Sequence, residues 1–371
     1  MRAATVPIQR PRDARLLTVD RYGRIDEHPR TAFADLLRPG DCVIANDAAT
    51  LPASLHGVHE RSGNVIEVRL AGRASLAGGD AMNRFSAIVF GTGDFHTLTE
   101  ERAAPPDLHR GDRLRFGADG ATIVRLLGHP RFVELHFDGD AAQVWRTLAS
   151  YGKPVQYAHL ADPLALWDVW TPIAAQPVAF EPPSAGFVLD WSTLDALHAR
   201  GVPFATLTHA AGLSSTGDAT LDQRLPLDEP YRIPVATAAL VETTRARGGR
   251  VVAIGTTVVR ALEHAAAIDG AVHPGDGIAT QRIGPHTRLR AVDVIVSGTH
   301  EPDSSHYALL RAFADASTLA RVTATLEAHR YRTHEFGDSI WVERSTDAVR
   351  KEDHVYDERQ GSWVAVPCDL S

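Results

Sequence analysis

An apolar run at residues 251–254 leads directly into Gly255, Thr256 and Thr257, and apolar residues at helical spacing follow. Glycine allows a tight turn and a close approach of a ligand to the backbone. The first turn of the predicted helix exposes free N–H groups at its positive dipole end, where a carboxylate or a ribose hydroxyl binds well. The structural alternative is that Thr256 or Thr257 only caps the helix.

A second polar segment follows the predicted strand 289–297. His300 titrates near neutral pH and is placed to act as an acid or a base, because ligands collect at the carboxyl ends of strands in open α/β sheets. The structural alternative is a loop histidine bonded to the backbone, with Ser304 as a helix cap. A metal site made of His300, Asp303 and His306 has no recognised ligand spacing, so we predict no metal.

Three other polar groupings each allow a structural explanation. Arg260 and Glu263 lie near one face of the predicted helix and are spaced to pair with each other. Asn46 and Asp47 end an apolar run, where an Asx turn is common, although they could also bind an amine or a ribose edge. Asp13 stands between arginines, which favours surface ion pairing.

Motifs of the common nucleotide-dependent and hydrolase classes are absent, since the sequence contains no Walker loop, dinucleotide fingerprint or nucleophile elbow. Cys42 and Cys368 are the two cysteines, so neither a disulfide framework nor a cysteine zinc site is expected. The chain has no apolar run long enough for a membrane helix and no secretory signal, so we predict a cytoplasmic protein without a membrane partner. The net charge of −8 does not indicate a dedicated nucleic-acid binder, but an acidic enzyme can still contact one RNA loop.

The predicted elements fall into two patterns. Short strand-like runs separated by Gly, Pro and Asp predict a small antiparallel β-barrel or sandwich; they are residues 64–70, 85–90, 112–116, 121–127 and 132–137. Beyond residue 184, helices and strands alternate, which predicts an α/β fold with a mainly parallel sheet and helices on both faces. We therefore predict a discontinuous α/β catalytic domain at 1–55 and 150–345, a β-barrel insert at 56–149, and a C-terminal tail at 346–371. The proline-rich stretch 153–183 is either a linker or a loop-rich wall of a site.

Several segments together resemble the S-adenosylmethionine:tRNA ribosyltransferase-isomerase family of queuosine biosynthesis. The resemblance is collinear over roughly residues 12–342. It rests on Arg12–Leu17, 36–41 with Asn46 and Asp47, 51–53, 111–114, 183–186, Glu229 with Tyr231, Gly255–Thr257 with Arg260 and Glu263, Asp293 with His300, Pro302 and Ser304, and 336–338.

This resemblance implies an α/β domain with an inserted β-barrel, and an enzyme that uses S-adenosylmethionine as a ribosyl donor. The acceptor is the aminomethyl group of a 7-deazaguanine in the tRNA anticodon loop; adenine and methionine leave, and the ribose becomes an epoxycyclopentanediol. It implies four catalytic candidates: His300, Asp47, Glu229 and Asp293. It implies twelve substrate-binding candidates: Asp13, Arg15, Asn46, Ser184, Gly186, Gly255, Thr256, Thr257, Arg260, Glu263, Ser304 and Asp338.

The sequence also departs from the family pattern. Ala49 and Ser54 stand where the family has arginines, Phe90–Gly93 replaces a basic stretch of the barrel, and Asp303 replaces a basic residue. Lost cations weaken phosphate contacts most directly. The alternatives are therefore an acceptor in tRNA, a small-molecule acceptor or a rearrangement of S-adenosylmethionine, and a non-catalytic binding protein on the same fold. The chain is expected to be a monomer or a homodimer.

Overall fold

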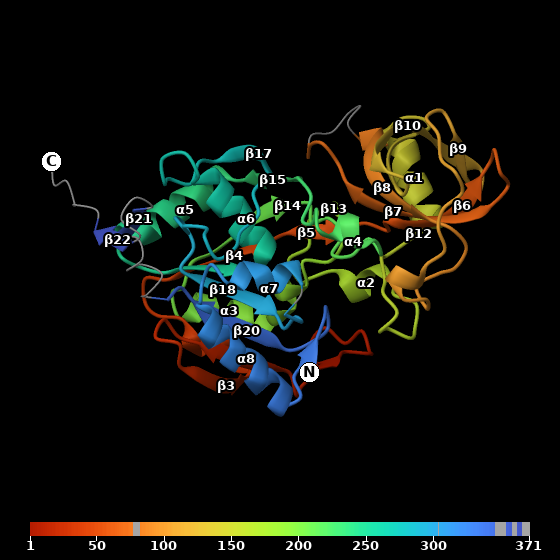
Figure 1. Ribbon diagram of the computed structural model, residues 1–371. Coiled ribbons are helices and arrows are strands. Elements are labelled where there is room, and N and C mark those ends of the chain that lie inside the picture. The colour runs from red at the N-terminus through yellow and green to blue at the C-terminus, as the bar shows by residue number, and fades with distance from the viewer. Residues whose placement is uncertain (77–81, 303, 346–353, 358–361, 366–371) are drawn as a thin grey trace.

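The computed structural model describes residues 1–76, 82–302 and 304–345, and the backbone of two further short strands (Figure 1). These are β21 (His354–Asp357) and β22 (Ser362–Ala365), which pair antiparallel. The rest of the predicted tail at 346–371 lies outside the described residues. In the described part of the chain, no helix has both the length and the apolar composition needed to cross a membrane.

One sheet of nine strands forms the centre of the larger part of the molecule. Its strands are, in spatial order, β17 (Gly275–Ala279), β15 (Glu229–Ile233), β14 (Phe204–His209), β4 (Cys42–Asn46), β16 (Val251–Ile254), β18 (Val294–Gly298), β20 (Ser339–Glu343), β2 (Arg15–Val19) and β3 (Ile25–Pro29).

The sheet is mixed, so the prediction of a mainly parallel sheet was wrong. Four neighbouring pairs are parallel, namely β14–β4, β4–β16, β16–β18 and β20–β2, and the other four are antiparallel. Three of the strands in antiparallel pairs, β3, β15 and β17, carry charged residues, proline or glycine in place of an apolar run. Such strands are typical of sheet edges, and they give little sequence signal.

Helices cover both faces of this sheet, as the alternating side chains of its strands require. On β4, Cys42 and Ile44 face one core, whereas Val43 and Ala45 face the other. The first core is closed by α5 (Val235–Ala246), α6 (Thr256–Ala265), α7 (Ser305–Leu310) and α8 (Ala316–Ala328). The second is closed by η1 (Arg30–Leu36), η4 (Ser184–Val188) and α3 (Trp191–Ala199).

The predicted antiparallel barrel is confirmed. Within the described residues, six strands close on themselves through a pairing of β6 with β9. In order around the barrel they are β6 (Ser54–His59), β7 (Val65–Gly72), β8 (Arg84–Phe90), β11 (Phe132–Phe137), β10 (Asp119–His129) and β9 (Arg113–Phe116). Helix α1 (Ala141–Tyr151) packs Val144 and Leu148 into the same core.

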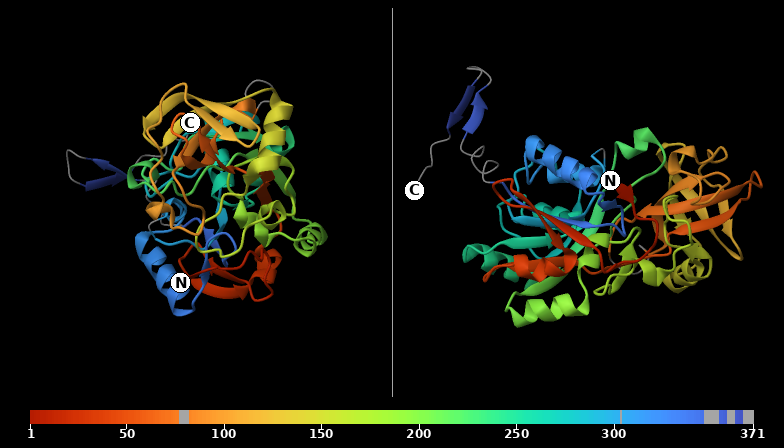
Figure 2. Two further views of the ribbon diagram at one scale, coloured as in Figure 1. Left: turned by 90° about the vertical axis from the view of Figure 1, so that its right-hand side faces the viewer. Right: turned by 90° about the horizontal axis from the view of Figure 1, so that it is seen from below.

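The barrel stands at one end of the molecule, and its two connections to the sheet lie next to each other (Figures 1 and 2). The chain enters through β6 and leaves through β12 (Gly152–Lys153), and these strands pair antiparallel, with Leu55 opposite Gly152. A second short ladder joins β5 (Ala48–Thr50) to β13 (Gln176–Ala179). Helix α4 (Ala219–Asp222) lies between the sheet and the barrel (Figure 1).

Candidate active site

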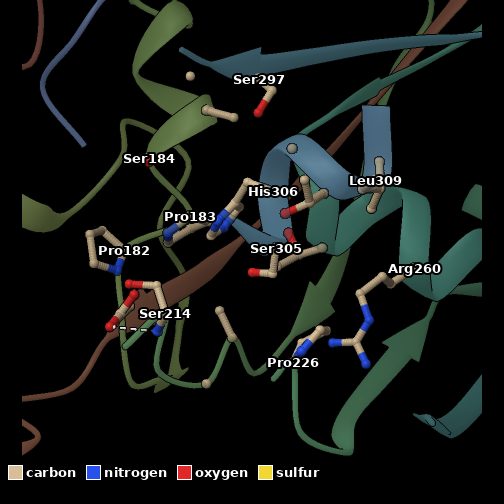
Figure 3. Close-up of a pocket in the computed structure, with 18 of the residues that line it drawn as sticks. Pro182, Pro183, Ser184, Ser214, Pro226, Arg260, Ser297, Ser305, His306 and Leu309 are labelled. Atoms are coloured by element: carbon tan, nitrogen blue, oxygen red, sulfur yellow. Dashed lines mark hydrogen bonds between the residues drawn. The ribbon is translucent and has the colours of Figure 1, made fainter. Parts of the chain in front are cut away.

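A pocket opens where the carboxyl ends of β16 and β18 meet the start of α6 and the start of α7 (Figure 3). Its lining comes from five segments: residues 181–185, 211–214, 255–257, 297–300 and 305–309, with Pro226, Glu229 and Arg260 added from the side. The two segments with the strongest sequence signals therefore line one cavity, although 42 residues lie between Thr257 and His300 in the sequence.

The start of α6 faces this pocket without a side-chain cap. Gly255 is the N-cap residue with φ of 98°, a conformation that favours glycine, and no side chain bonds to the first turn. Thr257 instead accepts a hydrogen bond from Asn46 at 3.3 Å through its Oγ1. The capping alternative for Thr256 and Thr257 was therefore wrong, and the N–H groups at this positive helix end have no side-chain partner among the described residues.

His300 stacks on His306, with ring centroids 4.4 Å apart and planes 12° apart. Within the described residues, His300 forms no hydrogen bond, so the alternative of a backbone-bonded loop histidine was wrong. Burial, and then the positive charge that His306 and His334 would carry, hold the pKa of His300 well below its usual range. Ser304 caps α7 by accepting from the Tyr307 N–H at 3.1 Å, as predicted, and Asp303 lies outside the described residues.

Glu229 and Arg260 form a buried ion pair in the pocket wall. Glu229 also accepts from the Gly212 N–H at 2.6 Å, and Arg260 donates to the carbonyl of Ala279 at 2.8 Å. Burial raises the pKa of Glu229 even though Arg260 opposes this rise. The predicted pairing of Arg260 with Glu263 is not formed.

Glu263, one turn further along α6, makes different contacts. Its carboxylate accepts from the backbone N–H groups of Arg290, Ala291 and Val292 at 2.6–3.0 Å. These bonds hold the segment that leads into β18, and Glu263 does not line the pocket. Its contribution is to position the strand that carries His300 at its other end.

Glu181 is the pocket residue that the sequence did not predict. Its Oε1 accepts hydrogen bonds from the Tyr157 hydroxyl and from the Ser214 N–H, the latter at 2.9 Å (Figure 3). Its Oε2 has no hydrogen-bond partner among the described residues. Burial raises the pKa of Glu181 to about 7, so this carboxyl group exchanges protons near neutral pH.

A second cavity continues outward from the first, and Glu181, Ser184, His300 and His306 line both. Tyr157 and His159 line it as well, so the proline-rich stretch 153–183 forms a wall of the site. His159, His334 and Glu335 offer ligand atoms within 4.8 Å of one another. The rings of His159 and His334 are stacked with planes 14° apart, so one ring would have to turn before both could bind a metal ion.

Two predicted catalytic residues lie outside the pocket lining. Asp293 precedes β18, at the opposite end of that strand from His300, and accepts from the Val251 N–H at 2.9 Å and from Arg344 at 3.0 Å. A strand of this length places the two ends roughly 17 Å apart. Asp47 accepts from the hydroxyls of Thr206 and Thr208 at 2.8 and 2.7 Å, which joins β4 to β14.

The remaining substrate-binding candidates divide in the same way. Ser184 lines the pocket, whereas Gly186 and Asn46 do not, and Asn46 joins strand ends by bonding the backbone of His209. Asp338 is buried and accepts from both Arg15 and Arg332, and Arg332 also reaches Asp13. This network, Asp13, Arg15 and Asp338 with Arg332, ties the N-terminal segment to the loop before β20, apart from the pocket lining.

The chain matches the family model described as "Queuosine biosynthesis protein" over residues 1–342. An S-adenosylmethionine:tRNA ribosyltransferase-isomerase of Symbiobacterium thermophilum is 32% identical over 352 residues, which cover 91% of this chain and 95% of the relative. That of Geobacter sulfurreducens is 33% identical over 339 residues, with 89% and 93% covered. The crystal structure of an S-adenosylmethionine tRNA ribosyltransferase from Thermotoga maritima covers 91% of this chain and 95% of its own, at 23% identity and a TM-score of 0.47.

Proposed function

The chain belongs to the queuosine biosynthesis protein family, and on that premise we propose that it is an S-adenosylmethionine:tRNA ribosyltransferase-isomerase. It transfers the ribosyl group of S-adenosylmethionine to the aminomethyl group of a 7-deazaguanine in tRNA and isomerises it, with release of adenine and methionine. The observation that carries the proposal is the family match over residues 1–342, in a chain whose pocket joins an open helix start to a pair of histidines.

We propose that S-adenosylmethionine, a charged and extended nucleoside, binds in the inner pocket. The uncapped start of α6 at Gly255 and Thr256 offers N–H groups to its carboxylate or to its ribose hydroxyls. The Glu229–Arg260 pair leaves the adjacent wall close to neutral, so the sulfonium faces no uncompensated cation. Ser184 and Ser214 add polar groups on the other side.

The reaction needs a base that reaches the carbon beside the sulfonium and an acid that assists the departure of adenine. His300 is suited to the first task, because its lowered pKa keeps the imidazole neutral and able to accept a proton. Glu181 is suited to the second, because its raised pKa keeps a proton available and its Oε2 is not engaged by another described group. Glu229 positions the pocket wall through its pair with Arg260. Asp47 and Asp293 hold the ends of neighbouring strands together and do not contact the substrate.

The alternative of a non-catalytic binding protein predicts a blocked pocket with His300 bonded internally. His300 instead lines both cavities and has no hydrogen bond within the described residues. A small-molecule acceptor is the remaining competitor, and it differs from the main proposal in one measurable respect, the dependence on tRNA.

The test is incubation of the chain with S-adenosylmethionine, with and without tRNA that carries the aminomethyl-deazaguanine, followed by mass analysis. Adenine and methionine should appear in equal amounts only when the tRNA is present. Release of adenine at the same rate without tRNA would contradict the proposal and favour the hypothesis of a small-molecule acceptor. We also keep as predictions a cytoplasmic location, a reaction without a metal, and a monomer or homodimer.

A further inference from the structure

Five arginines line a groove between the barrel and the β17 edge of the sheet. Arg73, Arg84 and Arg125 come from the barrel, and Arg224 and Arg282 come from segments next to β15 and β17. We call this feature the arginine groove. Arg84, Arg125, Arg224 and Arg282 are exposed, so four of the five guanidinium groups are accessible to a partner.

The arginine groove is positive in a protein that is acidic overall. Glu134 and Asp228 are the acidic residues in its lining, so arginine exceeds acid there by three charges. Glu134 contacts Arg125 at 2.9 Å and Arg84 at 3.6 Å, and both arginine side chains remain more than half exposed. The whole chain carries a net charge of −8, so this local excess is opposite in sign to the protein as a whole and attracts anions.

Contacts across the groove hold part of this charge in place. The guanidinium of Arg224 lies 5.2 Å from the ring centre of Phe132 on β11 and donates to the carbonyl of Leu127 on β10 at 3.3 Å. Arg282 donates to the carbonyl of Gln223 in the neighbouring segment. Arg224 thus reaches from the sheet side of the groove to the barrel, and Arg282 is held beside it.

The groove and the active-site pocket share Pro226 in their linings. A polyanion that follows the groove therefore passes directly beside the opening where the reaction takes place. Planar guanidinium groups bind phosphate oxygens with two hydrogen bonds, and a row of them suits a chain of phosphates better than a single small anion.

We propose that the arginine groove binds the phosphate backbone of tRNA and thereby presents the anticodon base to the pocket. This inference rests on the proposed function, in which tRNA is the acceptor. The contacts are to the backbone, so they supply affinity and placement, while recognition of the base itself belongs to the pocket. The groove also offsets the loss of basic residues in the family motifs at Ala49 and at Phe90–Gly93.

The experiment measures binding of transcribed tRNA by fluorescence anisotropy over a series of KCl concentrations. The variant R84Q/R282Q removes one charge from each wall of the groove. We expect its Kd to rise roughly tenfold at moderate salt, and the slope of log Kd against log salt to fall by about 0.7 to 0.9 for each arginine. The variant R84K/R282K keeps both charges and should bind nearly as the parent does.

The matched control is R24Q/R200Q, which removes the same charge from exposed residues at the β2–β3 turn and at the end of α3. It should bind tRNA as the parent does. The proposal that the arginine groove binds tRNA would be wrong if the groove variant and the control variant had equal Kd values and equal salt slopes, both with parental melting temperatures. Failure of the proposed function is a separate result: no adenine release by the parent with modified tRNA, whatever the binding data show.

Discussion

The two ends of the parallel strands β16 and β18 differ in how they use charge. At their amino ends, Arg250 bonds Asp41 and Glu343, and Asp293 bonds Arg344 and the Val251 N–H. At their carboxyl ends, the start of α6 has no cap, and Glu181 has one oxygen without a hydrogen-bond partner among the described groups. The polar groups at the first end are paired with one another, whereas the second end also carries polar groups without a partner among the described residues.

This difference explains why both ends carry residues that resemble the family motifs. The motif residue Asp293, at the amino end of β18, bonds to other parts of the chain, whereas the motif residues Gly255 and His300 follow the carboxyl ends of β16 and β18 and line the pocket. Strand direction, which is visible only in three dimensions, separates Asp293 from His300 although seven positions divide them in the sequence. Each of the following predictions tests one side of this comparison.

His300→Ala should give the largest effect, a fall in kcat of about 1000-fold, or roughly 4 kcal/mol, because a proton acceptor is removed from the pocket. The measurement is tRNA-dependent adenine release at saturating S-adenosylmethionine. His286→Ala changes an exposed histidine outside the pocket lining and serves as the control with parental turnover. A His300 variant with unchanged kcat would remove the assigned base.

Arg250→Ala should lower the free energy of unfolding by about 3 kcal/mol, because it removes the cation that bonds both buried carboxylates, Asp41 and Glu343, and leaves only their weaker contacts with Arg38. Urea unfolding measures this loss. Arg200→Ala breaks an exposed pair with Asp35 and should cost less than about 1 kcal/mol. Equal losses of unfolding free energy in the two variants would contradict the claim that buried ion pairs stabilise the amino ends of β16 and β18.

Glu181→Gln should reduce kcat by about 100-fold and change the pH profile. With a pKa of about 7, Glu181 holds its proton below pH 7 and loses it above, so the rate of the parent should fall as pH rises through that value. The glutamine variant should lack this falling limb, since its amide does not titrate. A limb that persists in the variant belongs to another group, and the assignment of the acid then fails.

Asp293→Asn should have the smallest effect. It weakens the bonds to Arg344 and to the Val251 N–H, and a stability loss of about 1 kcal/mol is expected from urea unfolding. Turnover of the variant, measured below its melting temperature, should stay within about twofold of the parent. A loss of kcat comparable to that of His300→Ala would show that the two strand ends share one function.

The sequence predicted the central strands and the barrel because their residues form apolar runs. β11 was predicted at residues 132–137 and lies at Phe132–Phe137, and β8 was predicted at 85–90 and lies at Arg84–Phe90. β3, β15 and β17 were missed because their polar and glycine-rich residues depend on pairing with a neighbour for their conformation. The same omissions produced the error about the parallel sheet. The domain boundaries at 56 and 149 stay predictions.

Sequence reasoning found the parts of the candidate site in which a glycine or a titratable residue directly follows an apolar strand, as at Gly255 and His300. Glu181 was missed because its environment is made by tertiary contacts: Tyr157 and Ser214 come from distant segments, and burial sets its pKa. A carboxylate in a proline-rich stretch has no periodic pattern around it. The only sequence signal near Glu181 was the proline-rich stretch 153–183, which was considered as a possible wall of the site.

The adjacent entry and exit of the barrel, at β6 and β12, have an evolutionary consequence. Because the two crossings are paired neighbours, about 5 Å apart, the chain enters and leaves the barrel at one place. Substitutions and loop insertions on the barrel can accumulate without disturbing the strand order that builds the pocket.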